Sequence, residues 1–273
     1  MKKKWGMGGL LLILLGAGLL CGCAKEKAEN PRYGVFIGAN PQQSDSFTGY
    51  DVIVIDAAYY TQAELDRLHQ DGATVYSYLN VGSLEDFRAF YPDYQHLILD
   101  EYDNWPGEYW VDITSPAWQS HIQEQAELLV EKGIDGFFID NADVYYQYPD
   151  PGIFQSLVTI LAQLGRFDKD IIMNGGDVFI AEAILEPASP LVEITGVNQE
   201  CVFTDIDFDT GRLTRQDADT TRYYQAYLEL CQRNGLTVYL LEYGADKTLL
   251  REMEEYCDKR QFGFYVSPSI DLP

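Results

Sequence analysis

The stretch GFFIDNAD, residues 136–143, joins a core segment to a polar end. Phe137, Phe138 and Ile139 suit a buried strand, yet Asp140 and Asn141 follow them directly. Short apolar runs of this kind recur from residue 33 onward, and they alternate with amphipathic stretches. Nearly continuous apolar runs are typical of parallel strands that helices cover. The pattern therefore predicts an α/β protein with polar side chains at the carboxyl ends of its strands.

The number and spacing of these runs predict the fold. Strands are predicted at residues 34–39, 51–57, 74–82, 136–141, 170–176, 192–200, 236–244 and 262–269. Helices are predicted at residues 61–72, 115–133, 151–165, 220–235 and 247–261. Eight strands alternating with helices over about 240 residues indicate a single TIM-type (β/α)8 barrel. An open doubly wound sheet is the alternative, but GANPQQSDS after the first strand lacks the spacing of a dinucleotide-binding loop.

The connection after the third strand is unusually long. Residues 83–114 are rich in Tyr, Trp and Asp, and they contain EYWVDIT, which reads as a short strand. We predict that this segment is an elaborated loop at the mouth of the barrel.

Residues 1–22 have the layout of a bacterial lipoprotein signal peptide. Three lysines precede an apolar run, and the final Leu20-Cys21-Gly22-Cys23 resembles a lipobox. This layout predicts cleavage before Cys23, lipidation of Cys23 and an extracytoplasmic protein anchored to the cell membrane. A plain secretory signal and an uncleaved anchor are the alternatives. Residues 23–32 would then be a polar tether, and residues 33–273 the barrel domain.

The charge of the chain limits its partners. Residues 1–22 carry three of the 19 basic residues and none of the 43 acidic ones, so their removal changes the net charge from −24 to −27. A surface of this charge argues against nucleic acid as a partner and suits a cationic one. The same negative charge argues against binding to anionic lipid headgroups, so we predict that the protein contacts the membrane through its lipid anchor alone.

Cysteine and histidine give little functional information. Three cysteines remain beyond the lipobox, and their spacing is not that of metal ligands: Cys201, Cys231 and Cys257. One disulfide among them is possible, but the sequence does not identify the pair. The three histidines are interpreted as surface or packing residues: His69, His96 and His121. The sequence therefore predicts no metal site.

Acids and amides recur where the predicted strands end. In chain order they are Asp56, Asn80, Asp140, Asn141, Asp143, Asn174, Glu200 and Glu242. The active site of an α/β barrel lies at these carboxyl ends, so the side chains would meet in one cavity. Asp and Asn also serve as helix caps, and we interpret Asp143 as an acid in the first turn of a helix. Glu is a poor cap, which makes Glu200 and Glu242 the more informative pair.

Such a mouth has the groups that a sugar site requires. Glycosidic cleavage needs two carboxyl groups, while amides bind hydroxyls and aromatic faces stack on sugar rings. The mouth segments contain Tyr59, Tyr60, Tyr91, Trp105, Trp110, Tyr145, Tyr146 and Tyr243. At least half of the aromatic residues are expected to do no more than pack in the core.

Four segments resemble glycoside hydrolase family 114. They are VYSYLNVGSLEDFR (75–88), YWVDITSPAWQSHIQEQAELLVEKGIDGFFIDNADVY (109–145), IIMNGG (171–176) and VNQECVF (197–203). The family contains endo-α-1,4-polygalactosaminidases with a (β/α)8 barrel. The resemblance thus implies retaining cleavage of a galactosamine-rich polysaccharide without a cofactor.

The resemblance also implies roles for individual residues. It makes Asp140 the nucleophile and Glu200 the general acid/base. Asp56 and Glu242 would bind substrate through its ammonium groups. The other predicted substrate-binding residues are Tyr78, Asn80, Asn141, Asn174 and Tyr243.

Two further functions compete with this one. A carbohydrate-binding lipoprotein whose catalysis has lapsed would keep the aromatic rim without needing both acids. An esterase is disfavoured because the chain lacks G-x-S-x-G and an evident histidine partner. The sequence favours a monomeric glycosidase that acts on an extracellular amino-sugar polymer such as a biofilm exopolysaccharide, and it leaves open endo or exo action.

Overall fold

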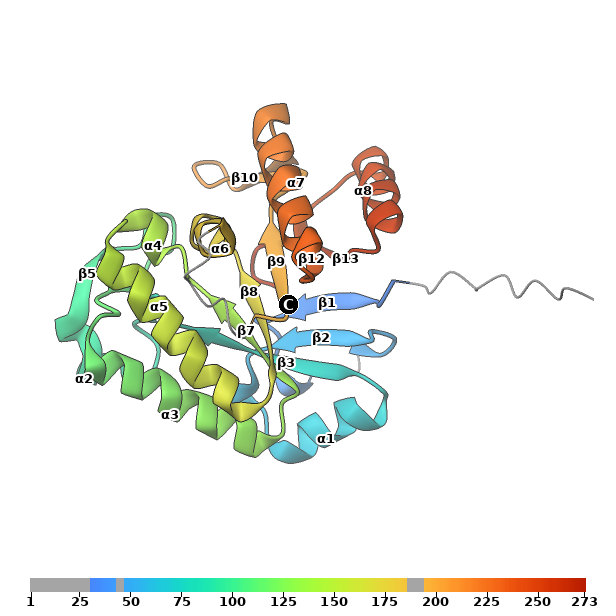
Figure 1. Ribbon diagram of the computed structural model, residues 1–273. Coiled ribbons are helices and arrows are strands. Elements are labelled where there is room, and N and C mark those ends of the chain that lie inside the picture. The colour runs from blue at the N-terminus through green and yellow to red at the C-terminus, as the bar shows by residue number, and fades with distance from the viewer. Residues whose placement is uncertain (1–29, 43–46, 186–193) are drawn as a thin grey trace, which may run out of the picture.

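Eight parallel strands form the centre of the protein in the computed structural model, which describes residues 30–42, 47–185 and 194–273 (Figure 1). Their order in the sheet is β1 Tyr33–Phe36, β2 Val52–Ile55, β3 Thr74–Asn80, β7 Gly136–Asp140, β8 Asp170–Asn174, β9 Gly196–Glu200, β12 Thr237–Tyr243 and β13 Gly263–Ser267. Each strand pairs in parallel with the next, and β1 lies against β13. The predicted TIM-type barrel and its eight strands are confirmed.

Helices cover the outside of this barrel (Figure 1). They are α1 Gln62–Gln70, α3 Pro116–Lys132, α5 Pro151–Leu164, α6 Asp177–Leu185, α7 Ala218–Arg233 and α8 Lys247–Arg260. Start and stop signals in the sequence account for several ends: the Glu64 carboxylate accepts hydrogen bonds from the backbone and hydroxyl of Thr61, and Gly133 ends α3 at φ 97°. Helix α6 was not predicted, because DVFIAEAIL is apolar nearly all round and lacks an amphipathic period.

The long connection after β3 is elaborated as predicted. It contains β4 Ser83–Glu85, α2 Tyr91–Tyr94, the 3-10 helix η3 Gln95–Leu97, β5 Ile98–Glu101 and β6 Glu108–Val111. Strands β4, β6 and β5 form a small antiparallel sheet, and β6 is the strand predicted within EYWVDIT. A second insertion, the hairpin of β10 Thr204–Asp207 and β11 Arg212–Arg215, follows β9 and was not predicted.

Alternation along the strands separates an inner face from an outer face, because successive side chains of a strand point to opposite sides. The inner cluster is Tyr33, Val35, Val52, Val54, Tyr76, Tyr78, Phe138, Ile172, Tyr239, Leu241, Tyr243 and Leu272. The intervening residues, such as Val75, Phe137 and Ile171, belong to the larger cluster that includes the helices. The last inward position of a strand therefore lies at the open end of the barrel, where a ligand can reach it.

The predictions about the N-terminal segment, a metal site and the cysteines concern residues outside the barrel strands. The signal peptide, most of the tether and Cys23 lie outside the described residues. Within the described ranges, no helix has the length and apolar character that a membrane span needs. The same residues contain no group of three or more His, Cys, Asp or Glu side chains that could hold a metal ion. The thiols of Cys201, Cys231 and Cys257 are all free.

Candidate active site

Four inward-facing polar residues end neighbouring strands of the barrel: Asp140 on β7, Asn174 on β8, Glu200 on β9 and Tyr243 on β12. The residue after each one has a left-handed backbone, with φ of 63°, 62°, 55° and 62° at Asn141, Gly175, Cys201 and Gly244. Left-handed conformations at residues other than glycine cost energy and gather at functional sites. The chain thus turns sharply after each of the four side chains.

One amide joins the two predicted catalytic acids. Asn174 Nδ2 donates to Asp140 Oδ1 at 2.8 Å and to Glu200 Oε1 at 2.7 Å. The sum of these distances, 5.5 Å, is the largest separation that the two oxygens can have. The other oxygen of Glu200 accepts a hydrogen bond of 2.6 Å from the Tyr243 hydroxyl. The structure therefore brings together Asp140, Asn174, Glu200 and Tyr243.

The two acids share an environment that favours a proton. Burial raises the pKa of Asp140 well above its usual value, and the nearby Glu200 charge raises it further. Burial also raises the pKa of Glu200, while the bonds from Tyr243 and Asn174 oppose that shift. Because a proton on one acid removes the repulsion felt by the other, we expect the pair to titrate as a unit and to hold one proton between them.

Asp143 lies beside this pair, at the N-terminus of the short helix α4 Val144–Gln147. Its Oδ2 accepts from the Gly176 backbone at 3.1 Å, and burial raises its pKa to about 6. A Cβ atom on Gly175 would lie 2.6 Å from the same oxygen. Only glycine fits this approach without a shift of the carboxylate. Asp143 is thus the N-cap residue of α4, one position before the predicted first turn, and its carboxylate holds the loop after β8 and does not cap the helix.

Asp56 is engaged by an arginine from the loop after β3. Its Oδ2 accepts from Arg88 Nη1 at 2.8 Å, and its Oδ1 accepts from the Ala58 backbone at the start of the 3-10 helix η2 Ala57–Tyr59. Arg88 also pairs with Glu85 through Nε at 2.6 Å. The Tyr78 hydroxyl donates weakly to Glu85 at 3.4 Å. Asp56 is 4% exposed, and its carboxylate is already paired with the Arg88 guanidinium of the protein itself.

Asn80, the last residue of β3, and Asn141, which follows β7, hold a carboxylate of β6 that the sequence did not single out. Nδ2 of Asn80 and Nδ2 of Asn141 both donate to Glu108 Oε1, at 3.2 and 2.7 Å, and both donate to Ser83 Oγ. Ser83 in turn donates to Glu108. Burial raises the pKa of Glu108. The amide nitrogens of Asn80 and Asn141 therefore tie β6 to the barrel.

Glu242 faces the outside of the barrel, because its neighbour Tyr243 faces inward. It has no exposed surface, and its carboxylate accepts from the Phe203 and Thr204 backbones at 3.0 and 2.8 Å and from the Thr204 hydroxyl at 2.5 Å. In this structure Glu242 supports the segment after Glu200 and has no surface for a substrate contact.

Aromatic side chains border the acids. Burial raises the pKa of the Tyr102 phenol, in the loop after β5, and the nearby charges of Asp140 and Glu200 raise this pKa further. Its ring stacks on Trp110 with centroids 4.0 Å apart. Trp105 meets Phe208 edge to face at 5.9 Å. Tyr102 and Phe208 were not predicted, because they follow the short strands β5 and β10 of the two insertions and not the predicted strands of the barrel.

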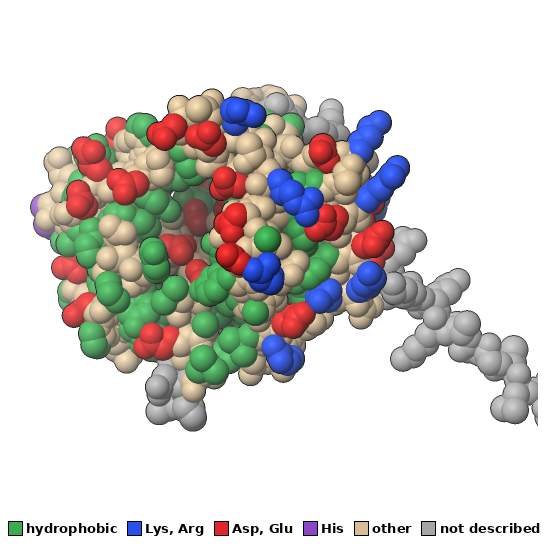
Figure 2. All heavy atoms as spheres, turned by 90° about the horizontal axis from the view of Figure 1, so that it is seen from above, with side chains coloured by type: hydrophobic (Ala, Val, Ile, Leu, Met, Phe, Trp, Pro, Cys, Tyr) green, Lys and Arg blue, Asp and Glu red, His purple; other side chains and the backbone are tan. Residues whose placement is uncertain are grey.

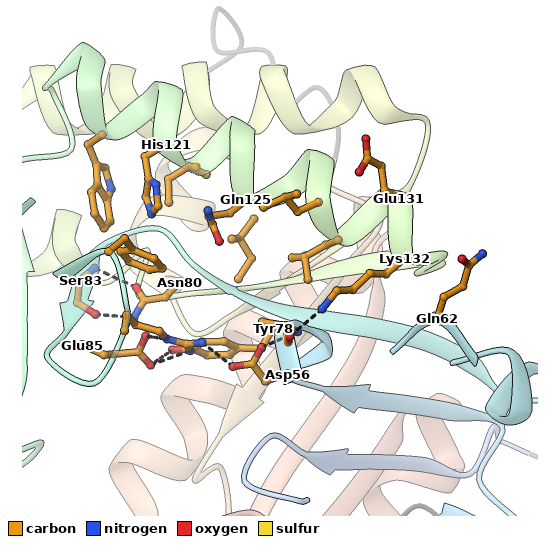
Figure 3. A pocket seen from close by; sticks show the side chains of 18 residues that line it. Asp56, Gln62, Tyr78, Asn80, Ser83, Glu85, His121, Gln125, Glu131 and Lys132 are labelled. Carbon is orange, nitrogen blue, oxygen red and sulfur yellow. Dashed lines mark hydrogen bonds and ion pairs between the residues drawn. The ribbon is translucent and has the colours of Figure 1, made fainter. Parts of the chain in front are cut away.

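A cavity of about 460 Å³ lies between α3 and β3, apart from the two acids (Figure 3). Asp56, Tyr78 and Asn80 line it, whereas Asp140 and Glu200 do not. Its wall on α3 includes His121, which packs among aromatic rings and whose pKa burial lowers to about 4. The predicted site residues thus do not form one group. Four lie together around Asn174, Asp56 and Tyr78 lie around Arg88, Asn80 and Asn141 hold Glu108, and Glu242 lies outside the barrel.

A parallel barrel with two half-buried carboxyl groups at its mouth is the arrangement of a barrel glycosidase. The chain belongs to glycoside hydrolase family GH114, whose family model matches residues 24–163. It is accordingly a glycosidase.

Two relatives in sequence have no described activity. An uncharacterised protein of Deinococcus radiodurans is 24% identical over 222 residues, which are 76% of this chain and 69% of that protein. An uncharacterised protein of Thermotoga maritima is 24% identical over 187 residues, which are 64% of this chain and 53% of that protein. The chain therefore spans about half the length of the second relative.

Solved structures share the fold. The glycoside hydrolase domain of PelA from Pseudomonas aeruginosa superposes with a TM-score of 0.73 at 20% identity, covering 88% of this chain and 94% of that one. Ega3 from Aspergillus fumigatus, in complex with galactosamine, superposes with a TM-score of 0.69 at 16% identity, covering 91% and 95%. At these identities the likeness concerns the barrel itself.

Proposed function

We propose that the protein is a retaining, endo-acting glycosidase that cleaves a galactosamine-containing polysaccharide, with Asp140 as nucleophile and Glu200 as general acid/base. The observation that carries this proposal is the bridge by which Asn174 holds both carboxyl groups. Retaining glycosidases place their carboxyl groups roughly 5–5.5 Å apart, whereas inverting ones leave roughly 6.5–9.5 Å for a water. An upper limit of 5.5 Å between the bridged oxygens supports retention.

The chemistry follows in two steps. The ionised Asp140 attacks the anomeric carbon while Glu200 gives its proton to the leaving oxygen, so the glycosidic bond breaks and a glycosyl–Asp140 ester forms. Glu200, now ionised, takes a proton from a water that attacks the same carbon. The ester breaks, Asp140 is released as a carboxylate, and the sugar leaves with its original anomeric configuration.

Charge supports a cationic substrate. The chain carries 43 acidic and 19 basic residues. In the view from above, acidic side chains lie within and around a hollow in the surface, while Lys and Arg gather away from it (Figure 2). An acidic cleft raises the local concentration of a cationic polymer such as deacetylated galactosamine. The galactosamine bound to Ega3, a protein of the same barrel fold, agrees with this substrate class.

The test uses residues 24–273 with α-1,4-linked galactosamine oligomers, N-acetylated or not. Mass spectrometry gives the product sizes, and NMR of the first products gives their anomeric configuration. Asp140→Asn and Glu200→Gln should each lower the rate at least about 100-fold. Glu254→Gln, at an exposed acid on α8, is the matched control and should cleave like the wild type.

The outcomes separate the alternatives. Internal cleavage with retained configuration supports the full proposal, whereas inverted configuration would refute the role of Asp140 as nucleophile. Binding of the oligomers without cleavage would favour the carbohydrate-binding lipoprotein.

Lipid anchoring at Cys23 belongs to the same proposal and is carried by the lipobox at residues 20–23. Expression of the full chain in a bacterium should place it in the membrane fraction with an acylated N-terminal cysteine. Cys23→Ser should release it, and an unmodified Cys23 in the wild type would rule out the anchor.

A further inference from the structure

A buried polar chain crosses the barrel from its first strand to the two acids. The Tyr33 hydroxyl on β1 donates to Asn198 Oδ1 at 3.0 Å, and Asn198 Nδ2 on β9 donates to Asn174 Oδ1 at 2.7 Å. Asn174 Nδ2 then donates to Asp140 and Glu200. Every bond in this chain runs in the same direction, from the phenol toward the carboxyl groups.

This direction fixes which end of the Asn174 amide faces the acids. A primary amide can turn over and exchange its donating nitrogen for its accepting oxygen. In Asn174 the turned amide would set its nitrogen against Asn198 Nδ2, leaving two donors face to face. Asn198 could then recover a partner only by turning as well. Its nitrogen would donate to the Tyr33 hydroxyl oxygen, and the hydrogen of that hydroxyl would lose the acceptor it has in Asn198 Oδ1.

Burial makes these alternatives costly. Tyr33 is 1% exposed and Asn198 is fully buried, so water does not replace a lost partner. An unsatisfied buried polar group costs about 1–3 kcal/mol. The Tyr33 ring is also held, because it packs against the Tyr239 ring with centroids 4.4 Å apart.

We propose that Asn198 and Tyr33 are positioning residues, which lock the Asn174 amide with its nitrogen toward both carboxyl groups. The lock keeps the two carboxyl groups at the spacing of a retaining enzyme and gives each one a donor. The positioning claim rests on the proposed function only in calling Asp140 and Glu200 catalytic.

The other groups around the acids lie outside this chain. Those with charge or a titratable group near the pair are Glu108 on β6, Asp143 at α4, Tyr243 on β12, Tyr102 after β5, Tyr78 on β3, Cys201 after β9 and Tyr224 on α7. None of them bonds to Asn198 or to the Tyr33 hydroxyl in the described structure. A change at Asn198 therefore reaches the acids through Asn174.

The experiment uses Asn198→Leu, which removes both bonds and keeps the branched shape of the side chain, and Tyr33→Phe, which removes only the hydroxyl. Ser77→Ala is the matched control, since Ser77 is fully buried on β3 and its hydroxyl contacts only the Ala57 and Tyr78 backbones. The Asp and Glu carboxyl carbons of each protein are titrated by NMR without substrate, and thermal unfolding is recorded beside them.

The amide donor lowers the pKa of each acid, so losing the lock should raise both. We expect Asn198→Leu to move the titration of the pair upward by about one pH unit, and Tyr33→Phe to move it in the same direction by less. Ser77→Ala should lower the melting temperature and leave the titration unchanged. In activity assays, kcat should fall for Asn198→Leu with little change in KM.

If the carboxyl groups of Asn198→Leu and Tyr33→Phe titrate as in the wild type and only the melting temperature falls, the proposal is wrong. The hydrogen-bonded chain from Tyr33 to Asn174 would then contribute to stability alone. If Asn198→Leu does not fold, Tyr33→Phe decides the matter, because its ring packing is kept. An inactive wild type would refute the proposed function, yet the titration would still decide the role of the lock.

Discussion

Glu242 and Tyr243 are adjacent in sequence but have opposite roles at the end of β12. Tyr243 faces into the barrel and bonds to Glu200, whereas Glu242 faces outward and holds the backbone at residues 203–204. The sequence indicated both as strand-end residues. The period-two alternation, counted back from Tyr243 through Leu241, would have separated them. The same count on β9 would have found Asn198 two residues before Glu200.

The bond from Tyr243 makes a prediction about pH. This bond lowers the pKa of Glu200, so Tyr243→Phe should raise it. Glu200 acts as an acid while it is protonated, and the basic limb of the kcat/KM profile should therefore move to higher pH, by up to about one unit. Tyr239→Phe, on the same strand and the same face, is the control. A shift of the basic limb to lower pH would contradict the assignment.

Cys201 carries backbone strain directly after Glu200, since its φ is 55°. Cys201→Gly should relieve this strain, while Cys201→Ala removes the thiol and keeps it. We expect the glycine variant to be more stable than the alanine variant by about 1 kcal/mol. Calorimetry of the two variants measures the difference, and an alanine variant that is equally stable would show that the backbone is unstrained.

At the scale of elements, two insertions meet over the barrel. Trp105 belongs to the connection after β3 and Phe208 to the hairpin after β9, and their strands are separated in the sheet by β7 and β8. Their contact therefore spans the carboxyl ends of the strands that carry Asp140 and Asn174. Both rings keep more than a third of their surface exposed, at 38% and 40%.

An exposed aromatic pair in this position predicts a contact with the polymer. Trp105→Ala should raise KM for long oligomers several-fold and leave kcat nearly unchanged, because the ring lies away from the reacting atoms. Phe208→Ala should have a similar effect, and the double variant should add little to either one. A fall in kcat without a change in KM would argue against a binding role.

The elements that the sequence predicted are those with a clear period or cap. The eight strands, the helices with amphipathic faces and the strand within EYWVDIT all fall in this class. Helix α6 and the β10–β11 hairpin were missed, since one lacks a polar face and the other is short and polar. Three residues around the site do not stand at the carboxyl end of a barrel strand, and only the tertiary structure brings them near the acids: Tyr33, Tyr102 and Glu108.

At the scale of the whole molecule, buried acids couple stability to pH. Burial raises the pKa of Asp143 from 3.8 to about 6 and that of Glu242 from 4.5 to about 7. A carboxyl whose pKa is higher in the folded state binds its proton more tightly there. Its contribution to stability is complete below the unfolded-state pKa and is lost as the pH rises through the folded-state value.

We therefore expect the melting temperature to fall by several degrees between pH 5 and pH 8. The net charge of −24 acts in the same direction through self-repulsion, so added salt should restore part of the loss at pH 8. Asp143→Asn should flatten the profile around pH 6. Scanning calorimetry across this range checks all three, and a melting temperature that rises toward pH 8 would contradict them.

The meeting of β1 and β13 gives the barrel a seam. No backbone ladder joins these strands within the described residues, and rings such as Phe36 and Tyr265, 5.2 Å apart, close the gap instead. Interlocked side chains separate more readily than a ladder of hydrogen bonds, so fluctuations should open the cylinder here first. The amides of β1 would then exchange with solvent deuterium sooner than those of β7, which is paired on both sides. Strand β1 would then separate from β13 in local opening events while β7 and β9, which carry the two acids, keep their backbone hydrogen bonds on both sides.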